Sequence, residues 1–321
     1  MSAHGGGRAI IAALLANTGI AVTKFLAFLL SGATSMLAEA VHSLADAGNQ
    51  LLLLLGKRKA AKAADAEHPF GYGRERYVYA FVVAIILFSV GGVFSLYEGW
   101  SKVQHPHPLD PTWWWLPFVV LGVAIALESY SLRTAVSESN QIRGGQSWIR
   151  FVRRAKAPEL PVVLLEDVAA LLGLVLALVG IGLTAITGNG LWDGLGTLAI
   201  GLLLVSVAVV LGIEMRSLLV GEGANPEDDA AIRRAIEAHP RIVRLIHAKT
   251  LYLGPEELLV AAKVGFDGDL SLSDAATAID EMEAAVRAAV PVARVIYIEP
   301  DVYVAAHAAP PTDAIVIKSA D

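Results

Sequence analysis

Long apolar stretches, separated by short polar connections, fill the first part of the chain. A helix rises about 1.5 Å per residue, so roughly 20 apolar residues cross the hydrocarbon core of a bilayer. Six stretches reach this length, and we predict a membrane-spanning helix in each of them: residues 9–30, 34–55, 77–100, 112–135, 160–186 and 191–213. The pattern therefore predicts an all-α transmembrane domain over residues 1–215.

From Asn225 onward the apolar runs become shorter and charged residues become more frequent. Asn225 can cap a helix that has proline at its first position and acidic residues in its first turn. Two apolar runs, 242–253 and 257–266, are joined by a Gly-Pro pair, which predicts a β-hairpin. A second capped helix is predicted from Ser273, and a closing strand over residues 292–299.

Together these elements predict a small α+β domain of order αββαβ, of the ferredoxin-like type, over residues 216–305. Such a domain buries one face of its sheet under two helices and can leave the other face open to a partner. Two copies of the chain could pair through that open face. Residues 306–321 show no clear period, and we expect them to form a flexible tail.

The composition places the first domain in a lipid bilayer. Of the 321 residues, 55% are hydrophobic and only 17% are charged, and the mean hydropathy is +0.57, which is too apolar for an ordinary soluble protein. The absence of cysteine excludes disulfide bonds and thiolate metal ligands. A net charge of −6 argues against a nucleic-acid partner.

Basic residues are concentrated in two of the connections. Lysines and arginines cluster within residues 57–76 and 143–156, whereas the intervening connections offer only Lys102. By the positive-inside rule, the two basic connections face the cytoplasm. An even number of spans then places the N-terminus, the C-terminus and the α+β domain on the cytoplasmic side as well.

Ionisable residues inside the spans are the strongest indication of function. His42 and Asp46 in the second span share one helix face, so the imidazole and the carboxylate can converge on one ion. Asp167 adds a carboxylate from the fifth span, and Glu166 lies about 100° further round that helix, so both bind one ion only if the helix is distorted. Such ligands suit zinc, or less strictly manganese or iron. The alternative is that His42 and Asp46 hydrogen-bond to neighbouring helices.

Two further charged residues lie at membrane depth, Lys24 in the first span and Glu128 in the fourth. We expect a structural ion pair or a snorkelling lysine, with a role in the ion path as the alternative. In the first basic loop, Asp65 and His68 adjoin a turn rich in proline and glycine, and they either bind a cytosolic ion weakly or belong to a plain solvated loop. No nucleophile and base set, nucleotide loop or cofactor motif indicates an enzyme.

Several motifs resemble those of the cation diffusion facilitator family. They are SGATSMLAEAVHSLADAGNQ, HPFGYGRER, YEGW and DGLGTLAIG, followed by the αββαβ domain. The resemblance implies a homodimer of six-helix protomers that pair through the membrane helices and through a metallochaperone-like cytoplasmic domain. It also implies efflux of a divalent cation, zinc first with manganese, iron or cobalt as alternatives, in exchange for protons by alternating access.

The resemblance also assigns ligands to the membrane site. The family places two ligands four residues apart in the second span, here His42 and Asp46, and two in the fifth span, here Val163 and Asp167. Val163 cannot coordinate a metal, and this departure resembles a divergent subgroup that includes the mitochondrial zinc exporter of animals. Glu166 or water could complete the ligand set.

Two accessory metal sites follow from the same resemblance. The loop site would use Asp65, His68 and the position of Tyr72, where the family often has histidine. The site in the α+β domain would fall on His247, Lys263, Tyr297 and Glu299. Because Lys263 is a cation where a ligand is expected, we predict that this second site is absent or weakened, and that the domain acts mainly in dimerisation.

A proton-coupled cycle follows from the chemistry of these ligands. Metal and protons compete for the same lone pairs, and an imidazole such as that of His42 exchanges protons near neutral pH. A cavity that opens alternately to either side would therefore exchange a cation for protons. A non-transporting metal sensor or dimeric scaffold and a passive channel are the rival functions. We expect the protein in the cell (inner) membrane of a prokaryote.

Overall fold

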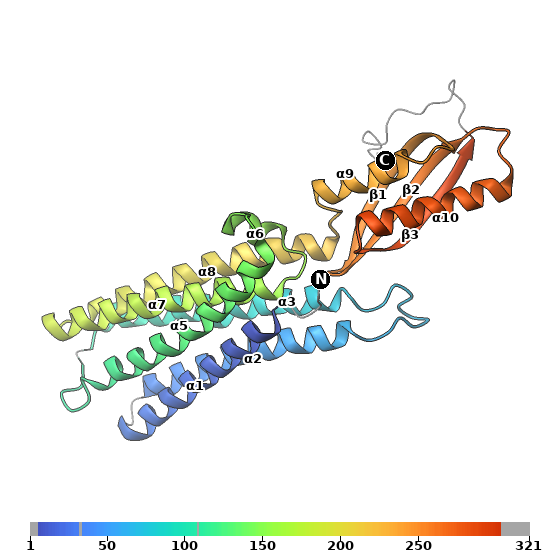
Figure 1. Ribbon diagram of the computed structural model, residues 1–321. Coiled ribbons are helices and arrows are strands. Elements are labelled where there is room, and N and C mark those ends of the chain that lie inside the picture. The colour runs from blue at the N-terminus through green and yellow to red at the C-terminus, as the bar shows by residue number, and fades with distance from the viewer. Residues whose placement is uncertain (1–5, 32–33, 108, 303–321) are drawn as a thin grey trace, which may run out of the picture. The chain divides into compact units, whose positions relative to one another are not determined.

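Two compact units make up the chain, which is described here from a computed structural model (Figure 1). The first unit, Met1–Leu219, is named the helical unit, and the second, Val220–Asp321, the α+β unit. The tail predicted at residues 306–321 lies outside the described residues. The structure describes residues 6–31, 34–107 and 109–302.

The helical unit is built from long helices that lie side by side (Figure 1). The helices are α1 (Gly7–Ser31), α2 (Thr34–Ala60), α3 (Glu75–Ile86), α4 (Phe94–Gln104), α5 (Leu116–Arg143), α6 (Trp148–Arg154), α7 (Glu159–Thr187) and α8 (Leu191–Val220). A π-helical segment, η1 (Leu87–Val93), joins α3 and α4 into one continuous span. Among the described residues, five helices are long and apolar enough to cross a membrane: α1, α3 to α4, α5, α7 and α8.

α2 has the length of a span, 27 residues, but it is less apolar than the other long helices. Polar residues on its inward side cause this difference, since Asn49 and Gln50 are fully buried. Its outward positions, among them Leu44 and Leu51, are apolar and exposed, as expected for a helix in lipid. α2 packs between α1 and α3 and completes the predicted set of six long helices.

The fourth span differs in extent from the prediction. It begins at Leu116 and not at residue 112, because residues 111–115 form a turn before the helix starts with Pro117 in its first turn. It continues to Arg143, beyond the predicted end at residue 135. Its last turns are helical but carry polar residues, and hydropathy does not assign such residues to a span. The short helix α6 in the following loop was not predicted.

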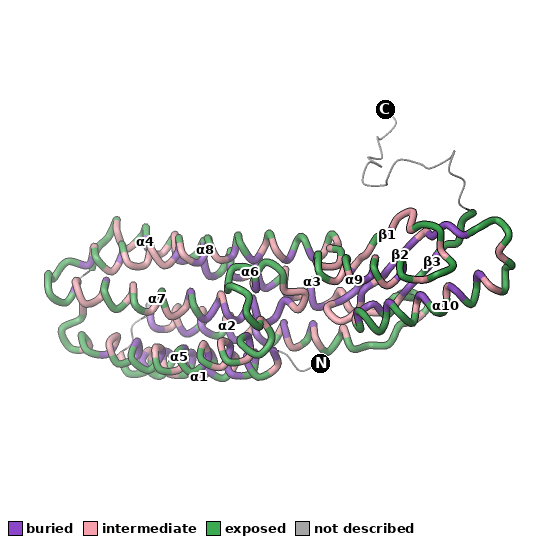
Figure 2. Tube along the Cα trace, turned by 45° about the horizontal axis from the view of Figure 1, so that its top comes forward, coloured by how far each residue is buried: buried purple, intermediate pink, exposed green. Residues whose placement is uncertain are grey.

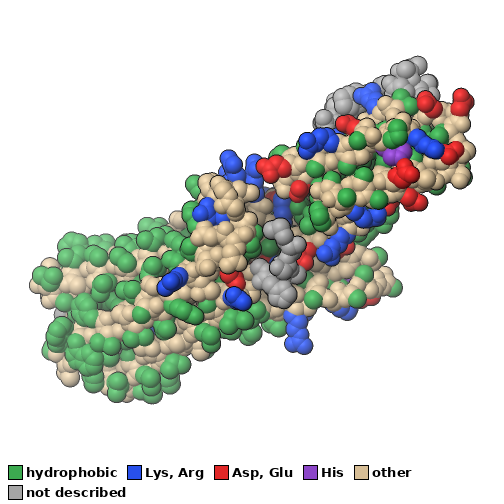
Figure 3. Space-filling view, viewed as in Figure 1, with side chains coloured by type: hydrophobic (Ala, Val, Ile, Leu, Met, Phe, Trp, Pro, Cys, Tyr) green, Lys and Arg blue, Asp and Glu red, His purple; other side chains and the backbone are tan. Residues whose placement is uncertain are grey.

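Burial divides the helical unit into an inner core and an apolar surface. Figure 2 shows the buried positions along the helices, and the core includes Leu53, Tyr77, Val83, Leu211 and Met215. Figure 3 shows hydrophobic side chains over much of the visible face of this unit. Such an extended apolar surface is unfavourable in water and is the normal outer surface of a protein in a bilayer. The unit is therefore a multi-pass membrane domain.

Glycines allow the third and sixth long spans to pack backbone against backbone. A Cβ atom at Gly99 on α4 would lie 2.6 Å from the backbone nitrogen of Leu198 on α8. A Cβ atom at Gly201 on α8 would in turn lie 2.8 Å from the backbone nitrogen of Leu96. Membrane helices associate through such small residues because no hydrophobic effect drives them together in lipid.

The α+β unit has the predicted order of elements. It contains α9 (Pro226–Glu237), β1 (Ile242–Gly254), β2 (Glu257–Phe266), α10 (Leu272–Ala289) and β3 (Ala293–Val302). β2 is the central strand; it pairs antiparallel with β1 and parallel with β3. The predicted fold class, six long membrane helices followed by a small αββαβ domain, is therefore confirmed.

Both helices of the α+β unit cover the same face of the sheet (Figure 1). The buried core between them includes Ile232 and Ile236 of α9, Met282 and Val286 of α10, and Val260 of β2. α10 begins at Leu272, one residue earlier than predicted, because Ser271 caps it by accepting a hydrogen bond from the backbone N–H of Asp274 at 3.1 Å.

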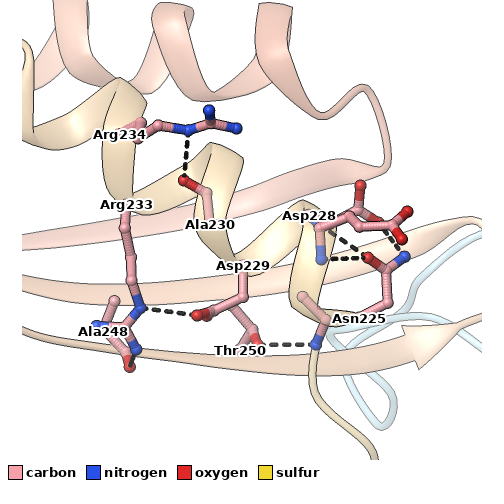
Figure 4. A network of polar contacts seen from close by, with 10 residues as sticks. Asn225, Asp228, Asp229, Ala230, Arg233, Arg234, Ala248 and Thr250 are labelled. Atoms are coloured by element: carbon pink, nitrogen blue, oxygen red, sulfur yellow. Dashed lines mark hydrogen bonds and ion pairs between the residues drawn. The ribbon is translucent and has the colours of Figure 1, made fainter.

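Polar contacts hold α9 against β1 (Figure 4). The side-chain oxygen of Asn225 accepts hydrogen bonds from the backbone N–H groups of residues 227 and 228, which confirms the predicted cap. The backbone N–H of residue 224 donates to Oγ1 of Thr250 on β1 at 2.9 Å. Arg233 pairs with Asp229 at 2.7 Å and donates to a β1 carbonyl oxygen. The cap therefore also fixes the position of the helix on the sheet.

The other face of the sheet has no helix over it within the described part of the α+β unit. The strand register aligns Ala261 on β2 with Tyr297 on β3, and Leu259 with Val295. These side chains are partly or fully exposed, and Tyr297 is 58% exposed. Residues alternate between the two faces of a strand, so this open face is the counterpart of the covered one.

Candidate metal site

A cavity of about 190 Å³ lies inside the helical unit. All four predicted ligands of the membrane site line it, namely His42, Asp46, Glu166 and Asp167. Lys24 and Glu128 line it as well. The fold therefore brings together, on one cavity, the ionisable residues that the sequence places in four different spans.

His42 and Asp46 lie on α2 and are half-buried at the cavity wall. Their side chains approach each other, with Nε2 of His42 3.7 Å from Oδ2 of Asp46. This distance exceeds that of a hydrogen bond, so the two groups share the cavity without being locked to one another. Both keep lone pairs available to a cation.

Asp167 lies on α7 and is almost completely buried. Its Oδ2 atom accepts a hydrogen bond of 2.7 Å from the hydroxyl of Ser131 on α5. The second carboxylate oxygen, Oδ1, has no hydrogen-bond partner among the described residues. The serine therefore orients a carboxylate that still has one oxygen available.

Glu166 is held differently from its neighbour. Its Oε1 accepts a hydrogen bond from Asn49 at 3.2 Å, and its Oε2 accepts one from Gln50 at 2.8 Å. Asn17 of α1 extends this network through a contact of 3.4 Å with Gln50. Since both oxygens are bonded to amides of α2, Glu166 connects α2 to α7, and its position is fixed by structural contacts.

The predicted ligands do not close around one point in this conformation. Among the residues that the structure describes, no three His, Asp or Glu side chains lie close enough together to hold an ion. Val163, the position that lacks a ligand, is fully buried in the hydrophobic core. Binding a cation would therefore require the side chains of α2 and α7 to move toward each other.

Lys24 forms an ion pair, as one of the predicted alternatives had it, but its partner is not Glu128. Nζ of Lys24 pairs instead with Oε2 of Glu39 on α2 at 3.4 Å. No described residue forms a hydrogen bond or ion pair with Glu128, although Glu128 is only 3% exposed. The sequence did not indicate this pairing, because the partners of a charged residue in a bundle come from neighbouring helices.

Other ion pairs in the helical unit were not predicted either. Lys102 at the end of α4 pairs with Glu98 at 3.3 Å and with Asp193 of α8 at 3.1 Å, and all three line the cavity. Arg76, which the sequence assigned to a basic loop, forms a buried bidentate pair with Glu159 at the start of α7. The only signal for these pairs was the presence of lone charges near the ends of apolar runs.

The loop residues Asp65 and His68 adopt a compact turn. Oδ2 of Asp65 accepts hydrogen bonds from Lys62 at 2.8 Å and from the Tyr72 hydroxyl at 2.7 Å, and Oδ1 accepts one from the backbone N–H of His68. These bonds hold the pKa of Asp65 well below its usual range, and the partner carboxylate raises the pKa of Lys62 to about 12. The contacts fit the plain-loop alternative better than a metal site, because a lysine already neutralises the carboxylate.

In the α+β unit, the register places His247, Lys263 and Glu299 in one row across the three strands. Nζ of Lys263 pairs with Glu299 at 3.0 Å and with Asp301 at 3.2 Å. These carboxylates raise the pKa of Lys263, so its ammonium group stays charged. This arrangement supports the prediction of an absent or weakened metal site, because a fixed cation occupies the centre of the row.

Together, a six-helix membrane unit with an ionisable internal cavity and a small αββαβ unit define a multi-pass integral membrane protein with an appended α+β domain. Residues 10–220 match the cation efflux transmembrane domain, and residues 224–301 match the cytoplasmic domain of cation efflux proteins. The chain therefore belongs to the cation efflux family, also called the cation diffusion facilitators.

Individual relatives of the chain share between 27% and 34% of their aligned residues with it. The chain is 34% identical over 266 residues to the mitochondrial proton-coupled zinc antiporter SLC30A9 of Homo sapiens, covering 82% of this chain and 46% of the relative. It is 29% identical over 265 residues to metal tolerance protein C4 of Arabidopsis thaliana, covering 82% of this chain and 58% of the relative. It is 27% identical over 208 residues to the magnetosome protein MamB of Magnetospira sp., covering 63% of each chain. The chain thus spans about half the length of the first two relatives.

Proposed function

We propose that this chain transports a divalent metal cation out of the cytoplasm in exchange for protons. The observation that carries the proposal is the cavity inside the helical unit, on which His42, Asp46 and Asp167 converge from α2 and α7. Ionisable groups at membrane depth are costly to bury and characteristically line ion paths. Membership of the cation efflux family supports the same function, as does the name of the human relative.

The ligands favour zinc. An imidazole nitrogen and two carboxylate oxygens are a common ligand set for this ion, and they accept the tetrahedral geometry that zinc prefers. The apolar Val163 leaves one position to another protein oxygen or to water. Because oxygen ligands also suit manganese and iron, those ions and cobalt are the alternative substrates.

Protons enter the cycle through the same atoms. A metal ion binds deprotonated carboxylates and a neutral imidazole, so loading the site from the cytoplasm releases protons. Protonation of the same groups, when the cavity opens to the other side, weakens binding and expels the ion. The hydrogen bond from Ser131 orients Asp167 for this exchange.

Two further properties belong to this proposal. We propose that the chain acts as a homodimer, paired through the open face of its sheet and through membrane helices. We also propose that both termini lie in the cytoplasm, as the basic connections indicate. A location in the inner membrane of a prokaryote stays a prediction.

Flux measurements in proteoliposomes test the transport proposal. Asp46→Asn and Asp167→Asn should each lower zinc flux by at least about tenfold, since loss of even an outer-shell partner commonly costs about 10–100-fold in metal affinity. Asp110→Asn, in an exposed turn between α4 and α5, is the matched control and should transport as the wild type does. Wild-type flux in both cavity variants would reject the site.

A pH gradient separates an antiporter from a passive channel. With equal zinc on both sides, an inward-directed proton gradient should drive zinc outward in the wild-type protein. Zinc that moves only down its own gradient, with no response to pH, would indicate a channel. Zinc binding without any flux would favour the rival function of a metal sensor or scaffold.

A further inference from the structure

Glu128 is a buried carboxylate on the cavity wall that lies outside the predicted ligand set. It lies on α5, lines the cavity together with His42, Asp46 and Asp167, and is only 3% exposed. No described residue forms a hydrogen bond or ion pair with it. A buried charge without compensation is strongly unfavourable, so such a group indicates either a role or an absent partner.

The other carboxylates on the cavity wall all have partners. Glu39 pairs with Lys24, while Glu98 and Asp193 pair with Lys102. Glu166 accepts hydrogen bonds from two amides, and Asp167 accepts one from Ser131. Asp46 lies beside the imidazole of His42. Among the described cavity carboxylates, Glu128 therefore stands apart as one without a hydrogen bond or ion pair; the only described cation acting on it is Lys24, at longer range and already paired with Glu39.

The packing of α5 brings Glu128 to the predicted ligands. Ser131 follows Glu128 by three residues and lies on the same buried face of α5, together with Ala124 and Ala135. Because Ser131 donates its hydrogen bond to Asp167, this contact anchors α7 at the level of Glu128. Glu128 consequently lies within electrostatic range of both Asp46 and Asp167.

We propose that the carboxylate of Glu128 is the cation ligand that takes the place of the one missing at Val163. This inference rests on the proposed function, and it adds α5 to the helices that hold the transported ion. Glu166, the neighbour of Asp167, fills this role less well, because both of its oxygens are already bonded to Asn49 and Gln50. A divalent cation would neutralise Glu128 and draw it toward Asp46 and Asp167.

The resulting site has one nitrogen and three carboxylate oxygens as ligands. Such an oxygen-rich set binds zinc and also accepts manganese, whereas each additional imidazole shifts the preference toward zinc. The residue at position 128 therefore also influences the selectivity between zinc and manganese, because it sets whether the fourth ligand is a carboxylate oxygen or another kind of atom.

Calorimetric titration of the full chain in detergent with zinc chloride tests the proposal. Glu128→Gln keeps the shape of the side chain but removes its charge, and we expect zinc affinity to fall by at least about tenfold. Glu138→Gln is the matched control on the same helix; Glu138 lies outside the cavity and accepts a hydrogen bond from the backbone N–H of residue 9. Its affinity should equal that of the wild type, and an equally unchanged Glu128→Gln would overturn the proposal.

Two more variants distinguish a ligand from a distant charge. Glu128→His has no negative charge but can bind zinc, so it should recover most of the affinity that Glu128→Gln loses and should discriminate more strongly against manganese. Glu128→Asp keeps the charge but shortens the reach, so it should bind zinc more weakly than the wild type. The proposal would be overturned if Glu128→His bound zinc no more tightly than Glu128→Gln while Glu128→Asp bound zinc as tightly as the wild type. Glu128 would then act through its charge alone and would not be a ligand.

The same titration separates this inference from the transport proposal. Asp46→Asn should lose zinc binding whether or not Glu128 is a ligand. A loss in Asp46→Asn without a loss in Glu128→Gln would remove Glu128 from the site and leave the transport proposal intact. Wild-type binding in Asp46→Asn would instead reject the proposed site itself.

Discussion

Individual carboxylates in the cavity are distinguished by what surrounds them. Glu166 is fixed by two amides, Asp167 is oriented by one hydroxyl, and Glu128 has no hydrogen-bond or ion-pair partner in the described part of the chain. A group that must bind and release an ion needs free lone pairs, whereas a group that holds helices together needs bonded ones. On this basis we expect Asp167 and Glu128 to bind the ion, and Glu166 to hold α2 and α7 together.

At the same scale, the sequence could identify some of these residues but not their partners. His42, Asp46 and Asp167 stand out because each interrupts an apolar run. The local pattern of apolar and polar residues, however, does not indicate that Lys24 pairs with Glu39, or that Arg76 is buried against Glu159. Ion pairs between helices depend on which faces meet, and a single sequence does not show this.

In the α+β unit, Asp274 provides a test of local electrostatics. Its carboxylate binds Arg241 at 2.7 Å and the Ser271 hydroxyl at 2.7 Å, and these contacts lower its pKa below the usual value. A lowered pKa means that the ionised form stabilises the fold above the pKa of the unfolded chain, and that this contribution is lost as the pH falls. Carboxyl NMR titration should show the pKa of Asp274 rising toward its usual value in Arg241→Gln. An unchanged midpoint would show that Arg241 has no influence.

At the level of elements, the contact between α4 and α8 depends on glycine. Gly99 leaves no room for a side chain beside the backbone of Leu198. Without such small residues the two spans could not approach closely enough to bring Lys102 to Asp193 on the cavity wall. The sequence predicted both spans, but this close contact depends on the tertiary arrangement of the helices.

Substitution of this glycine should destabilise the helical unit. Gly99→Ala forces a methyl group against backbone atoms, and overpacking of this kind typically costs about 1–3 kcal/mol. The melting temperature of the full chain in detergent should fall by several degrees, which a thermal-shift assay measures. Gly122→Ala on α5 is the control, since a Cβ atom there meets nothing within 4 Å. Equal melting temperatures in the two variants would contradict the packing argument.

Helices and strands were predicted correctly where a single local sequence pattern determines their structure. The order αββαβ followed from a cap at Asn225, two apolar runs and the Gly-Pro turn that joins them at Gly254. Hydropathy also located the long helices, although α2 carries its polar residues toward the cavity. The π-helical segment η1 and the short helix α6 escaped prediction, because neither changes the apolar pattern of the sequence.

On the scale of the whole molecule, the chain combines a membrane unit that contains the cavity with a unit whose sheet has an open face. In the row of His247, Lys263 and Glu299 on that sheet, the ammonium group of Lys263 neutralises the Glu299 carboxylate. The α+β unit can pair with a second copy through the neighbouring apolar positions whether or not it binds a metal. Pairing of this kind would join two membrane units into one assembly.

The proposed dimer can be tested on the open face. Tyr297→Asp places a charge at an exposed aromatic position, and loss of a central tyrosine contact commonly costs 2 kcal/mol or more, about thirtyfold in affinity. Ala284→Asp, at an exposed position on α10, is the control on the opposite side. Mass photometry of the full chain in detergent should show monomers for Tyr297→Asp only. Dimers in both variants would place the interface elsewhere.

We propose that one cation binds inside the helical unit between α2, α5 and α7. Anomalous X-ray scattering from crystals of the full chain grown with zinc tests it most directly. We expect a zinc peak in the cavity, with ligand atoms of His42, Asp46 and Asp167 at about 2.0–2.2 Å. Density for the Glu128 carboxylate at the same distance would add the proposed fourth ligand. A zinc peak confined to the loop after α2 or to the α+β unit, with none in the cavity, would show that the transported ion does not bind between these helices.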